Sequence, residues 1–340
     1  MSWNYYLQNP GNEFFEDFLY AVGLTPKSTE SLAKRKFTNV HLLAMGLSAP
    51  DVDECQELDA YLRSHPEEVD IPDTLGRTPV CWAASRQDLE IVTILLKHKA
   101  SVLHADKRMQ TPLHYCAGSG SARTMKLLLE QARKSVRSVE DLDPALKPSS
   151  PLALHDIVDA RDTKGRTPLN FATRMDFPAH AQLLIPANAD MECADDQYDK
   201  TILLFALYWN SHAVLPILLE SGARTDVVDA RQATILHHAA RYADLETLTI
   251  LSNHDLGIIN VAAVDDAGNT ANDIMNAPNE RMVRESDHRR QKSKDIFQRM
   301  IESQTHARMN RSGYVTEISS DEDARPGAAN VAFRTLSAPT

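Results

Sequence analysis

Large aliphatic residues recur along this chain as adjacent pairs at a regular interval. Each pair stands sixteen and seventeen residues after a threonine, and a shorter apolar run follows that threonine directly. Two apolar runs of this length and spacing predict two short helices, so the pattern indicates an array of two-helix units that pack against one another. The pairs are Ile94-Leu95, Leu127-Leu128, Leu183-Leu184, Ile217-Leu218 and Ile250-Leu251.

Six threonines mark the start of the repeated unit, and an aspartate lies five residues before each of them. The successive threonine spacings are 33, 56, 34, 33 and 36 residues, and the interval of 56 is one period of 33 plus an insertion of 23 residues, at 133–155. Threonine can cap a helix, and a proline directly after it suits the first helical turn. The threonines are Thr78, Thr111, Thr167, Thr201, Thr234 and Thr270.

A glycine follows the aspartate three residues later in half of the units, as Gly76, Gly165 and Gly268. Glycine at this place predicts a tight turn with a positive φ angle. The other units have Met109, Asp199 and Gln232 at this place, so we expect less favourable turns there.

A period near 33 residues together with the segment Thr111-Pro-Leu-His114 is the signature of ankyrin repeats. From about Asp51 to Ile301 the chain therefore resembles an ankyrin-repeat protein. The resemblance implies an all-α ankyrin-repeat solenoid of helix-turn-helix units with β-turn fingers. It also implies that the histidine of this segment hydrogen-bonds loop backbone and ties neighbouring repeats together, which gives His114 and His237 a structural role.

The regions around the repeats differ from them in pattern. Residues 51–70 look like the second half of a degenerate first repeat, and Ile296, Phe297, Met300 and Ile301 form one apolar stripe of a C-terminal helix. We interpret the insertion as a surface loop. The expected organisation is an N-terminal helical segment at 1–50, the ankyrin-repeat array at 51–278 with its insertion at 133–155, a C-terminal capping helix at 279–308 and a disordered tail at 309–340.

Composition narrows the classes of function. The 340 residues carry a net charge of −11, which disfavours a dedicated nucleic-acid binder because phosphate contacts need an excess of lysine and arginine. Four cysteines are too few for a disulfide framework, no apolar stretch is long enough to span a membrane, and no signal peptide is visible. We therefore expect a cytoplasmic or nuclear protein with no membrane partner.

The sequence shows no catalytic motif beside the repeats. No metalloprotease, P-loop, dinucleotide-binding or Cys-x-x-Cys pattern appears, and stacked repeats do not bring together the three or four ligands of a metal site. Trp82, Tyr115, Phe171 and Phe205 share one position of the first helix, which favours core packing over a cofactor cage. We therefore expect no enzyme activity, no cofactor and no metal.

The surface that the resemblance assigns to binding is rich in basic residues. Partners of ankyrin repeats usually meet a concave face, made by the finger tips and the exposed side of the first helices. The family's variable positions there number 28 in this chain and hold 10 lysines and arginines, against 36 in all 340 residues. Arginine beside aromatic residues is typical of interaction hot spots. The residues expected to bind a partner are Arg77, Arg86, Lys107, Arg108, Lys164, Arg166, Arg174, Tyr198, Lys200, Tyr208, Trp209, Arg231, Arg241 and Tyr242.

These observations favour a non-catalytic protein–protein interaction module, an adaptor or regulator, that binds an acidic segment of another protein with Tyr208 and Trp209 as anchors. One alternative is an accessory subunit of a biosynthetic or signalling pathway. Another is a nucleic-acid-associated regulator that uses the basic concave face and the basic stretch His288–Lys294. In a further interpretation the positive charges are solvated and only balance the acidic termini. Ser319 and Ser320 precede three acidic residues and resemble a phosphorylation site.

Overall fold

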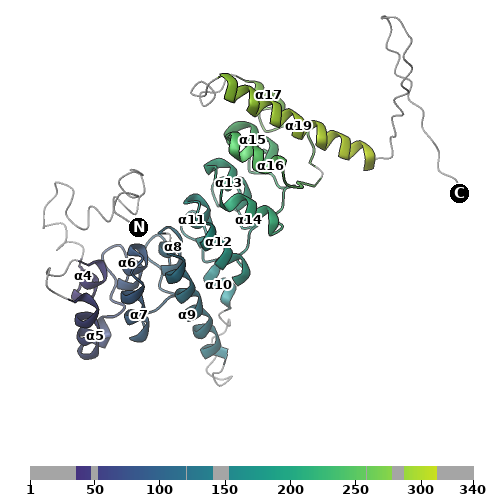
Figure 1. Ribbon diagram of the computed structural model, residues 1–340. Coiled ribbons are helices and arrows are strands. Elements are labelled where there is room, and N and C mark those ends of the chain that lie inside the picture. Colours follow the sequence, from purple (N-terminus) through teal and green to yellow (C-terminus); the bar gives the residue numbers. More distant parts are fainter. Residues whose placement is uncertain are drawn as a thin grey trace, which may run out of the picture.

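The computed structural model describes residues 36–46, 53–119, 121–140, 153–257, 259–277 and 287–311. Within these ranges the chain forms two rows of helices side by side, one short helix from each repeat in each row (Figure 1). The all-α array of two-helix units predicted from the sequence is confirmed. The first helices are α4 (Asn39–Met45), α6 (Pro79–Arg86), α8 (Pro112–Ala117), α11 (Pro168–Arg174), α13 (Ile202–Trp209), α15 (Ile235–Tyr242) and α17 (Ala271–Asn276). The second helices are α5 (Glu54–Ser64), α7 (Leu89–Lys97), α9 (Ala122–Glu140), α12 (Pro178–Leu184), α14 (Val214–Glu220), α16 (Leu245–Ser252) and α19 (Asp287–Arg311). Three short elements are α10 (Leu154–Val158) and the 3₁₀ turns η1 (Pro66–Glu68) and η2 (Ile185–Ala187).

The histidine of the repeat signature joins one unit to the next. In the second unit, Nδ1 of His114 accepts a hydrogen bond from the backbone N–H of Thr111 at 3.1 Å, and its Nε2 donates to the carbonyl of Arg166 at 3.1 Å. His237 makes the same two contacts, with Thr234 and with Asn269 of the next unit. The structural role expected for both histidines is confirmed.

Asn170 takes the same position in the third unit but makes only half of this link. Its side-chain oxygen accepts a hydrogen bond from the backbone N–H of Thr167 at 2.9 Å. Its Nδ2 is buried and has no hydrogen-bond partner among the described residues, because the shorter side chain does not reach the next finger. The link between the third and fourth units is therefore weaker than the links that His114 and His237 make.

A further unit precedes the first one expected from the sequence. Thr38 caps α4, and the ring of His41 accepts from the Thr38 N–H at 3.2 Å and donates to the carbonyl of Arg77 at 3.1 Å. Helix α4 packs against α5 and α6, as a first helix does elsewhere in the array. The array thus begins before the predicted boundary at residue 50, and residues 1–35 lie outside the described part of the chain. The signal was the spacing of Thr38 and His41, which repeats that of Thr111 and His114.

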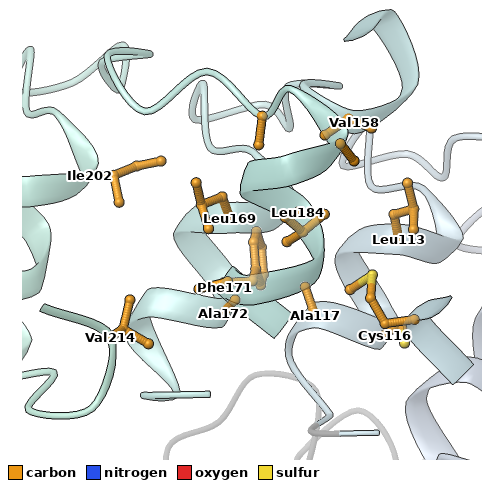
Figure 2. Close-up of a cluster of buried hydrophobic side chains, with 14 of the residues drawn as sticks. Leu113, Cys116, Ala117, Val158, Leu169, Phe171, Ala172, Leu184, Ile202 and Val214 are labelled. Carbon is orange, nitrogen blue, oxygen red and sulfur yellow. The ribbon is translucent and has the colours of Figure 1, made fainter. Parts of the chain in front are cut away.

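The core is a continuous ladder of side chains between the two rows. Around the third unit, Leu169, Leu184, Ile202 and Leu113 are fully buried, and Leu169 and Leu184 lie between Ile202 on one side and Leu113 on the other (Figure 2). The aliphatic pairs seen in the sequence contribute one buried member each from the second helices, such as Leu218. Each unit therefore buries its apolar surface only together with its neighbours.

The array is curved toward the row of first helices. Neighbouring first helices pack more closely against one another than neighbouring second helices do. A stack of such units bends toward its more closely packed row. The turns that precede the first helices are called fingers. The concave face is the surface formed by these fingers and by the exposed sides of α6, α8, α11, α13 and α15.

The insertion is partly helical. Helix α9 continues to Glu140, so residues 133–140 are a helical extension and the interpretation of this part as a loop is wrong. The apolar face of α9 extends past the repeat, with Ala132 and Val136 still buried, and this keeps the chain helical. Residues 141–152 of the insertion lie outside the described residues.

The C-terminal helix closes the array. Helix α19 packs against α16 and α17 in the place of a second helix, and the first residues of the expected segment, 279–286, lie outside the described residues. Phe297 and Met300 are buried in this contact, and Ile296 and Ile301 are packed beside them. The tail from residue 312 onward, with Ser319 and Ser320, lies outside the described residues.

Candidate protein-binding face

Each finger is a backbone turn held by one aspartate. In the first finger, a carboxylate oxygen of Asp73 accepts hydrogen bonds from the backbone N–H groups of Leu75 at 2.8 Å and Arg77 at 2.9 Å. In four other fingers, one carboxylate oxygen likewise accepts from the backbone N–H groups of the residues two and four positions after the aspartate. These aspartates are Asp106, Asp162, Asp229 and Asp265. The shape of each finger is therefore set inside the protein before any partner binds.

All six fingers use a left-handed residue two positions before the threonine. The φ angles are 85° at Gly76, 73° at Gly165 and 81° at Gly268, as the sequence predicted. A side chain on Gly76 would also meet the backbone nitrogen of Lys107 at 3.0 Å, so the next finger leaves no room for one. The remaining three residues are strained, because a Cβ atom disfavours positive φ. They are Met109 at 60°, Asp199 at 53° and Gln232 at 57°.

Backbone hydrogen bonds join each finger to the next. The N–H of Lys107 donates to the carbonyl of Leu75 at 2.9 Å, and the N–H of Ala230 donates to that of Tyr198 at 2.9 Å. Equivalent bonds link Thr163 to Arg108, Asp196 to Lys164 and Asp266 to Arg231. Side chains at the finger tips are therefore held in one row at intervals of one repeat.

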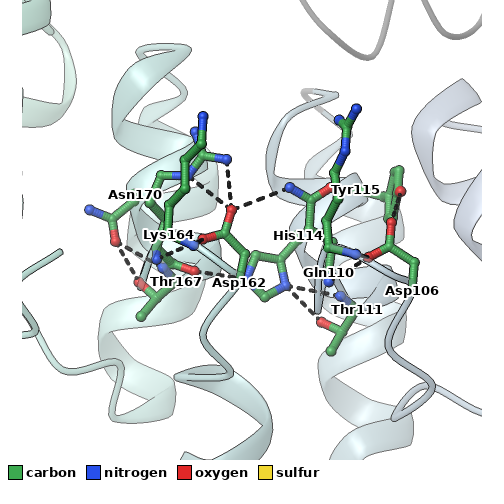
Figure 3. Close-up of polar contacts among 11 residues, drawn as sticks. Asp106, Gln110, Thr111, His114, Tyr115, Asp162, Lys164, Thr167 and Asn170 are labelled. Atoms are coloured by element: carbon green, nitrogen blue, oxygen red, sulfur yellow. Dashed lines mark hydrogen bonds and ion pairs between the residues drawn. The ribbon is translucent and has the colours of Figure 1, made fainter. Parts of the chain in front are cut away.

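The insertion does not interrupt this row (Figure 3). Nε2 of Gln110 donates to Asp162 at 3.3 Å across the inserted segment, next to the contact of His114 with the third finger. Tyr115 donates its hydroxyl to Asp106 at 2.6 Å and so occupies the second oxygen of that carboxylate. The second and third fingers thus behave as neighbours in spite of their distance in sequence.

The fourth finger is one residue longer than the others. Its carboxylate belongs to Asp195, which accepts from the N–H of Lys200 at 2.9 Å with one oxygen and from the N–H groups of Gln197 and Tyr198 at 3.3 Å with the other. Asp196, which lies five residues before Thr201 and was therefore expected here, is exposed and pairs with Arg161 at 2.7 Å. The assignment of Asp196 is therefore wrong, because two adjacent aspartates compete and the buried one closes the turn.

Two of the arginines expected to bind a partner are engaged within their own fingers. The side chain of Arg77 is only 3% exposed, its Nε lies 3.1 Å from Asp73, and its guanidinium lies 4.0 Å from the ring centre of Trp82. Arg166 pairs with Asp162 at 2.6 Å and keeps 15% of its side chain exposed. The surface position expected for Arg77 is wrong, and the charge of Arg166 is largely neutralised, because both follow an aspartate by four residues and pair with it.

Arg86 also serves the array itself. Its guanidinium donates to the carbonyl of Ala44 at 3.3 Å and lies 3.7 Å from both Glu54 and Asp88. It thereby ties α6 to the preceding unit.

Five of the predicted cations do lie exposed on the concave face. Four of them lie on the second, third and fifth fingers and one lies on α11, whereas the exposed acidic residues Asp196, Asp199 and Asp266 lie on the fourth and sixth fingers. The five are Lys107, Arg108, Lys164, Arg174 and Arg231.

The predicted aromatic residues gather at the fourth and fifth units because α13 and α15 pack side by side. Tyr198 is 40% exposed and Tyr208 is 44% exposed. The ring of Tyr208 meets that of Tyr242 edge to face, with centroids 4.9 Å apart. Trp209 is half-buried and stacks on Phe205 at 4.7 Å, so it is supported from below by a core residue.

Lys200 stands at the position of Arg77 but in a different environment. It is only 8% exposed, yet no described residue accepts a hydrogen bond from its ammonium group. Four aromatic rings surround the Nζ atom instead. Their centroids lie at 5.0 Å for Tyr198, 5.0 Å for Tyr208, 5.7 Å for Tyr242 and 5.9 Å for Phe205.

A hollow of about 270 Å³ opens beside this ammonium group, between the fourth and fifth fingers and helices α13 and α15. Its cationic lining residues are Lys200, Arg231 and Arg241, and its carboxylates are Asp229 and Asp265. Burial lowers the pKa of Lys200 from its usual value, and the nearby carboxylates partly offset this effect.

The two carboxylates of the hollow are already occupied. One oxygen of Asp229 accepts from the backbone of the fifth finger, and the other lies 3.0 Å from Nε2 of buried His238. Burial raises the pKa of Asp229, but the hydrogen bonds from His238 and the backbone outweigh it and lower the pKa. Burial also lowers the pKa of His238, so its neutral ring donates to Asp229. Asp265 holds the sixth finger and lies 3.4 Å from Arg241.

Other kinds of site find no support in the described part of the chain. Among those residues, no group of three or more His, Cys, Asp and Glu side chains is placed to hold a metal ion. None of the helices described there combines the length and apolar character that crossing a membrane requires.

Residues 49–138 match the family model of ankyrin repeats, in three copies. The chain is 31% identical to inversin from Canis lupus familiaris over 176 residues, which are 52% of this chain and 14% of inversin. It is 23% identical to ankyrin repeat protein nuc-2 from Neurospora crassa over 242 residues, which are 71% of this chain and 20% of that protein. The matches thus span a fifth or less of these curated relatives.

The structure is similar to the crystal structure of the ankyrin repeat domain of Bcl-3, a member of the IkappaB protein family. The TM-score is 0.56 at 20% sequence identity, and the match covers 78% of this chain and 99% of that domain. At this identity the likeness shows the fold.

Proposed function

Since this chain is an ankyrin-repeat protein, we propose that it acts in the cytoplasm or nucleus as a non-catalytic adaptor or regulator, and that its concave face binds an acidic segment of another protein. Ankyrin repeats are protein–protein interaction modules. The observation that carries the proposal is the row of exposed finger-tip cations, Lys107, Arg108, Lys164 and Arg231, on fingers joined by backbone hydrogen bonds.

Charge and rigidity both favour such a partner. The molecule as a whole carries a net charge of −11, so an acidic partner is repelled by most of its surface and attracted by this row. Because the hydrogen-bonded fingers fix the spacing of the cations, little conformational entropy of the backbone is lost when a partner binds. An extended segment that runs along the fingers meets at least one exposed cation in the second, third and fifth repeats.

The aromatic end of the face supplies a different kind of contact. Tyr208 is exposed and Trp209 is half-buried against Phe205, so a partner covers rings that are already held in place. Rigid aromatic residues beside arginine are the usual anchors of protein interfaces. In this proposal the cations govern the association rate, and Tyr208 and Trp209 govern the dissociation rate.

A selection from a random-sequence peptide library on the immobilised full chain tests the proposal. We expect enrichment of peptides rich in aspartate and glutamate. The double variant Lys164→Glu with Arg174→Glu is expected to lower their affinity about tenfold or more, with a weaker dependence on salt. The matched control is Arg123→Glu with Lys126→Glu, which makes the same charge change at exposed positions of the outer helix α9.

Selection of neutral or basic peptides would contradict the proposal. An equal loss of affinity in the control variant would also contradict it, because the effect would then follow from net charge and not from the concave face.

A further inference from the structure

The ammonium group of Lys200 ends a nearly buried side chain, borders an open hollow and donates no hydrogen bond to a described residue. Lysine carries three N–H donors on this group, and a buried charge is costly unless it is paired and hydrogen-bonded. The residue is 8% exposed, and no described residue accepts from it. Such a group, directed into an open hollow, points to a ligand that supplies the acceptor.

The reason that Lys200 lacks an internal partner lies in the length of its finger. Arg77 and Arg166 follow their aspartates by four residues and pair with the second carboxylate oxygen. Lys200 follows Asp195 by five residues, and both oxygens of Asp195 accept from backbone N–H groups. The extra residue therefore leaves the side chain of Lys200 without the carboxylate that its equivalents use.

The surrounding groups hold the charge in place without pairing it. Aromatic rings attract an ammonium group through their electron-rich faces but present no lone pair in the geometry of a hydrogen-bond acceptor. Asp229 is near enough to favour the charged form of Lys200, but its oxygens are used by the fifth finger and by His238. The hollow is thus preorganised for an anion.

We propose that this hollow is a carboxylate pocket, which takes one glutamate side chain of the acidic segment and places its carboxylate on Nζ of Lys200, with Arg231 and Arg241 beside it. The inference rests on the proposed function and names the one point of the concave face where a single acidic side chain is recognised.

Charge and size decide between possible anions. Three cations and two carboxylates line the hollow, so its formal charge of +1 is balanced by one carboxylate, whereas a phosphate monoester brings about two negative charges. A volume of about 270 Å³ holds a single side chain but no folded segment. The rings of Tyr208 and Tyr242 form part of the wall of the hollow, and glutamate offers them one methylene group more than aspartate does.

The test measures binding of fluorescein-labelled hexaglutamate to the full chain by fluorescence anisotropy. Lys200→Met keeps most of the side-chain volume and removes the charge, and we expect it to weaken binding about tenfold or more. Lys107→Met removes an exposed finger-tip cation and is the matched control, with an expected loss of less than about threefold. The unfolding midpoint of Lys200→Met is expected to equal or exceed that of the wild type, because a buried charge without an acceptor has been removed.

The outcomes separate this inference from the proposed function. Binding that falls with Lys164→Glu and Arg174→Glu but equally little with Lys200→Met and Lys107→Met would overturn the pocket and leave the acidic-segment proposal standing. No binding of hexaglutamate by the wild type would overturn both. Tighter, Lys200-dependent binding of hexa-phosphoserine than of hexaglutamate would overturn the choice of a carboxylate.

A measurement on the wild-type protein tests the pocket even if the variant does not fold. The four rings around Lys200 are expected to shift the NMR signals of its terminal methylene group upfield. Hexaglutamate should move these signals before those of the exposed lysines, and an unchanged Lys200 signal in the bound state would overturn the pocket.

Discussion

The first and fourth fingers have the same kinds of residues at equivalent positions, but the cation has a different role in each. Both place a cation directly before the capping threonine and both hold the turn with a buried aspartate. In the first finger Arg77 closes on Asp73 and covers Trp82, so the cation becomes part of the core. In the fourth finger one additional residue keeps Lys200 apart from Asp195, and the cation faces a hollow. One residue of turn length thus separates a stabilising ion pair from a candidate binding group.

The comparison shows that the number of cations at the variable positions does not tell how many of them are available to a partner. Arg77, Arg166 and Lys200 look equivalent in the sequence, since each precedes a threonine of the repeat. Their surroundings differ because an arginine four residues after an aspartate finds its carboxylate nearby, while a lysine five residues after it does not. The fourth and fifth units are therefore the part of the array where stability and binding conflict.

The largest expected difference is in stability. Arg77→Met leaves the buried carboxylate of Asp73 without its charged partner and should lower the free energy of unfolding by about 3–5 kcal/mol. Lys200→Met removes a charge that has no acceptor and should leave this free energy unchanged or raise it. Chemical denaturation of both variants measures the contrast, and similar losses in the two variants would refute it.

A second contrast, between His114 and Asn170, concerns the loss of folding stability at low pH. Burial lowers the pKa of His114 to about 4, against about 6.5 in an unfolded chain, so the unfolded state binds more protons between these values. Folding free energy is therefore lost as the pH falls from about 6.5 to about 4, by roughly 3 kcal/mol for this histidine. His114→Asn, which copies Asn170 of the next unit, should cost about 1 kcal/mol at pH 7 and remove this part of the pH dependence.

Unfolding curves at several pH values check this prediction. Because His41, His180 and His238 are also buried with lowered pKa values, both proteins keep some acid sensitivity, and only the difference between them reports His114. Parallel pH profiles for the wild type and His114→Asn would show that this ring is not buried in its neutral form.

The length of the fourth finger is the direct cause proposed for its open cation. Deletion of Asp196 places Lys200 four residues after Asp195, and we expect the two side chains to pair as Arg77 and Asp73 do. Hexaglutamate binding should then fall about tenfold, which is about 1.4 kcal/mol, with the fold retained. Asp196→Asn is the matched control, because it removes the pair with Arg161 without a change in length, and it should bind hexaglutamate no more weakly than the wild type does.

The smallest expected effect tests strain in the fingers. Met109 has a φ angle of 60° where the first finger has Gly76, so Met109→Gly should raise the free energy of unfolding by about 1 kcal/mol. Met109→Ala keeps the Cβ atom and should bring no such gain. Equal stability of the two variants would place the strain elsewhere.

Much of the architecture is readable from local chemistry. The period, the capping threonines, the ties of His114 and His237 and the positive φ of the finger glycines depend on contacts within one repeat or with the next one, and each leaves a fixed spacing in the sequence. The preceding unit at Thr38 has the same spacing of threonine and histidine, but its second helix begins sixteen residues after the threonine, against eleven residues in the next unit. The gathering of Tyr208 and Tyr242 also followed from the repeat, since they stand seven and eight residues after Thr201 and Thr234, at adjacent positions of neighbouring first helices.

By itself the sequence determined the fold and the identity of the residues on the concave face, because repetition turns a spacing along the chain into a place in space. Only the tertiary structure decided which cations are exposed, because Arg77, Arg86 and Arg166 find partners that depend on exact turn length and on neighbouring helices. The tertiary structure also decided which aspartate holds the fourth finger. Asp195 and Asp196 are adjacent and identical in the sequence, but only the carboxylate of Asp195 is buried against the backbone N–H groups of the finger.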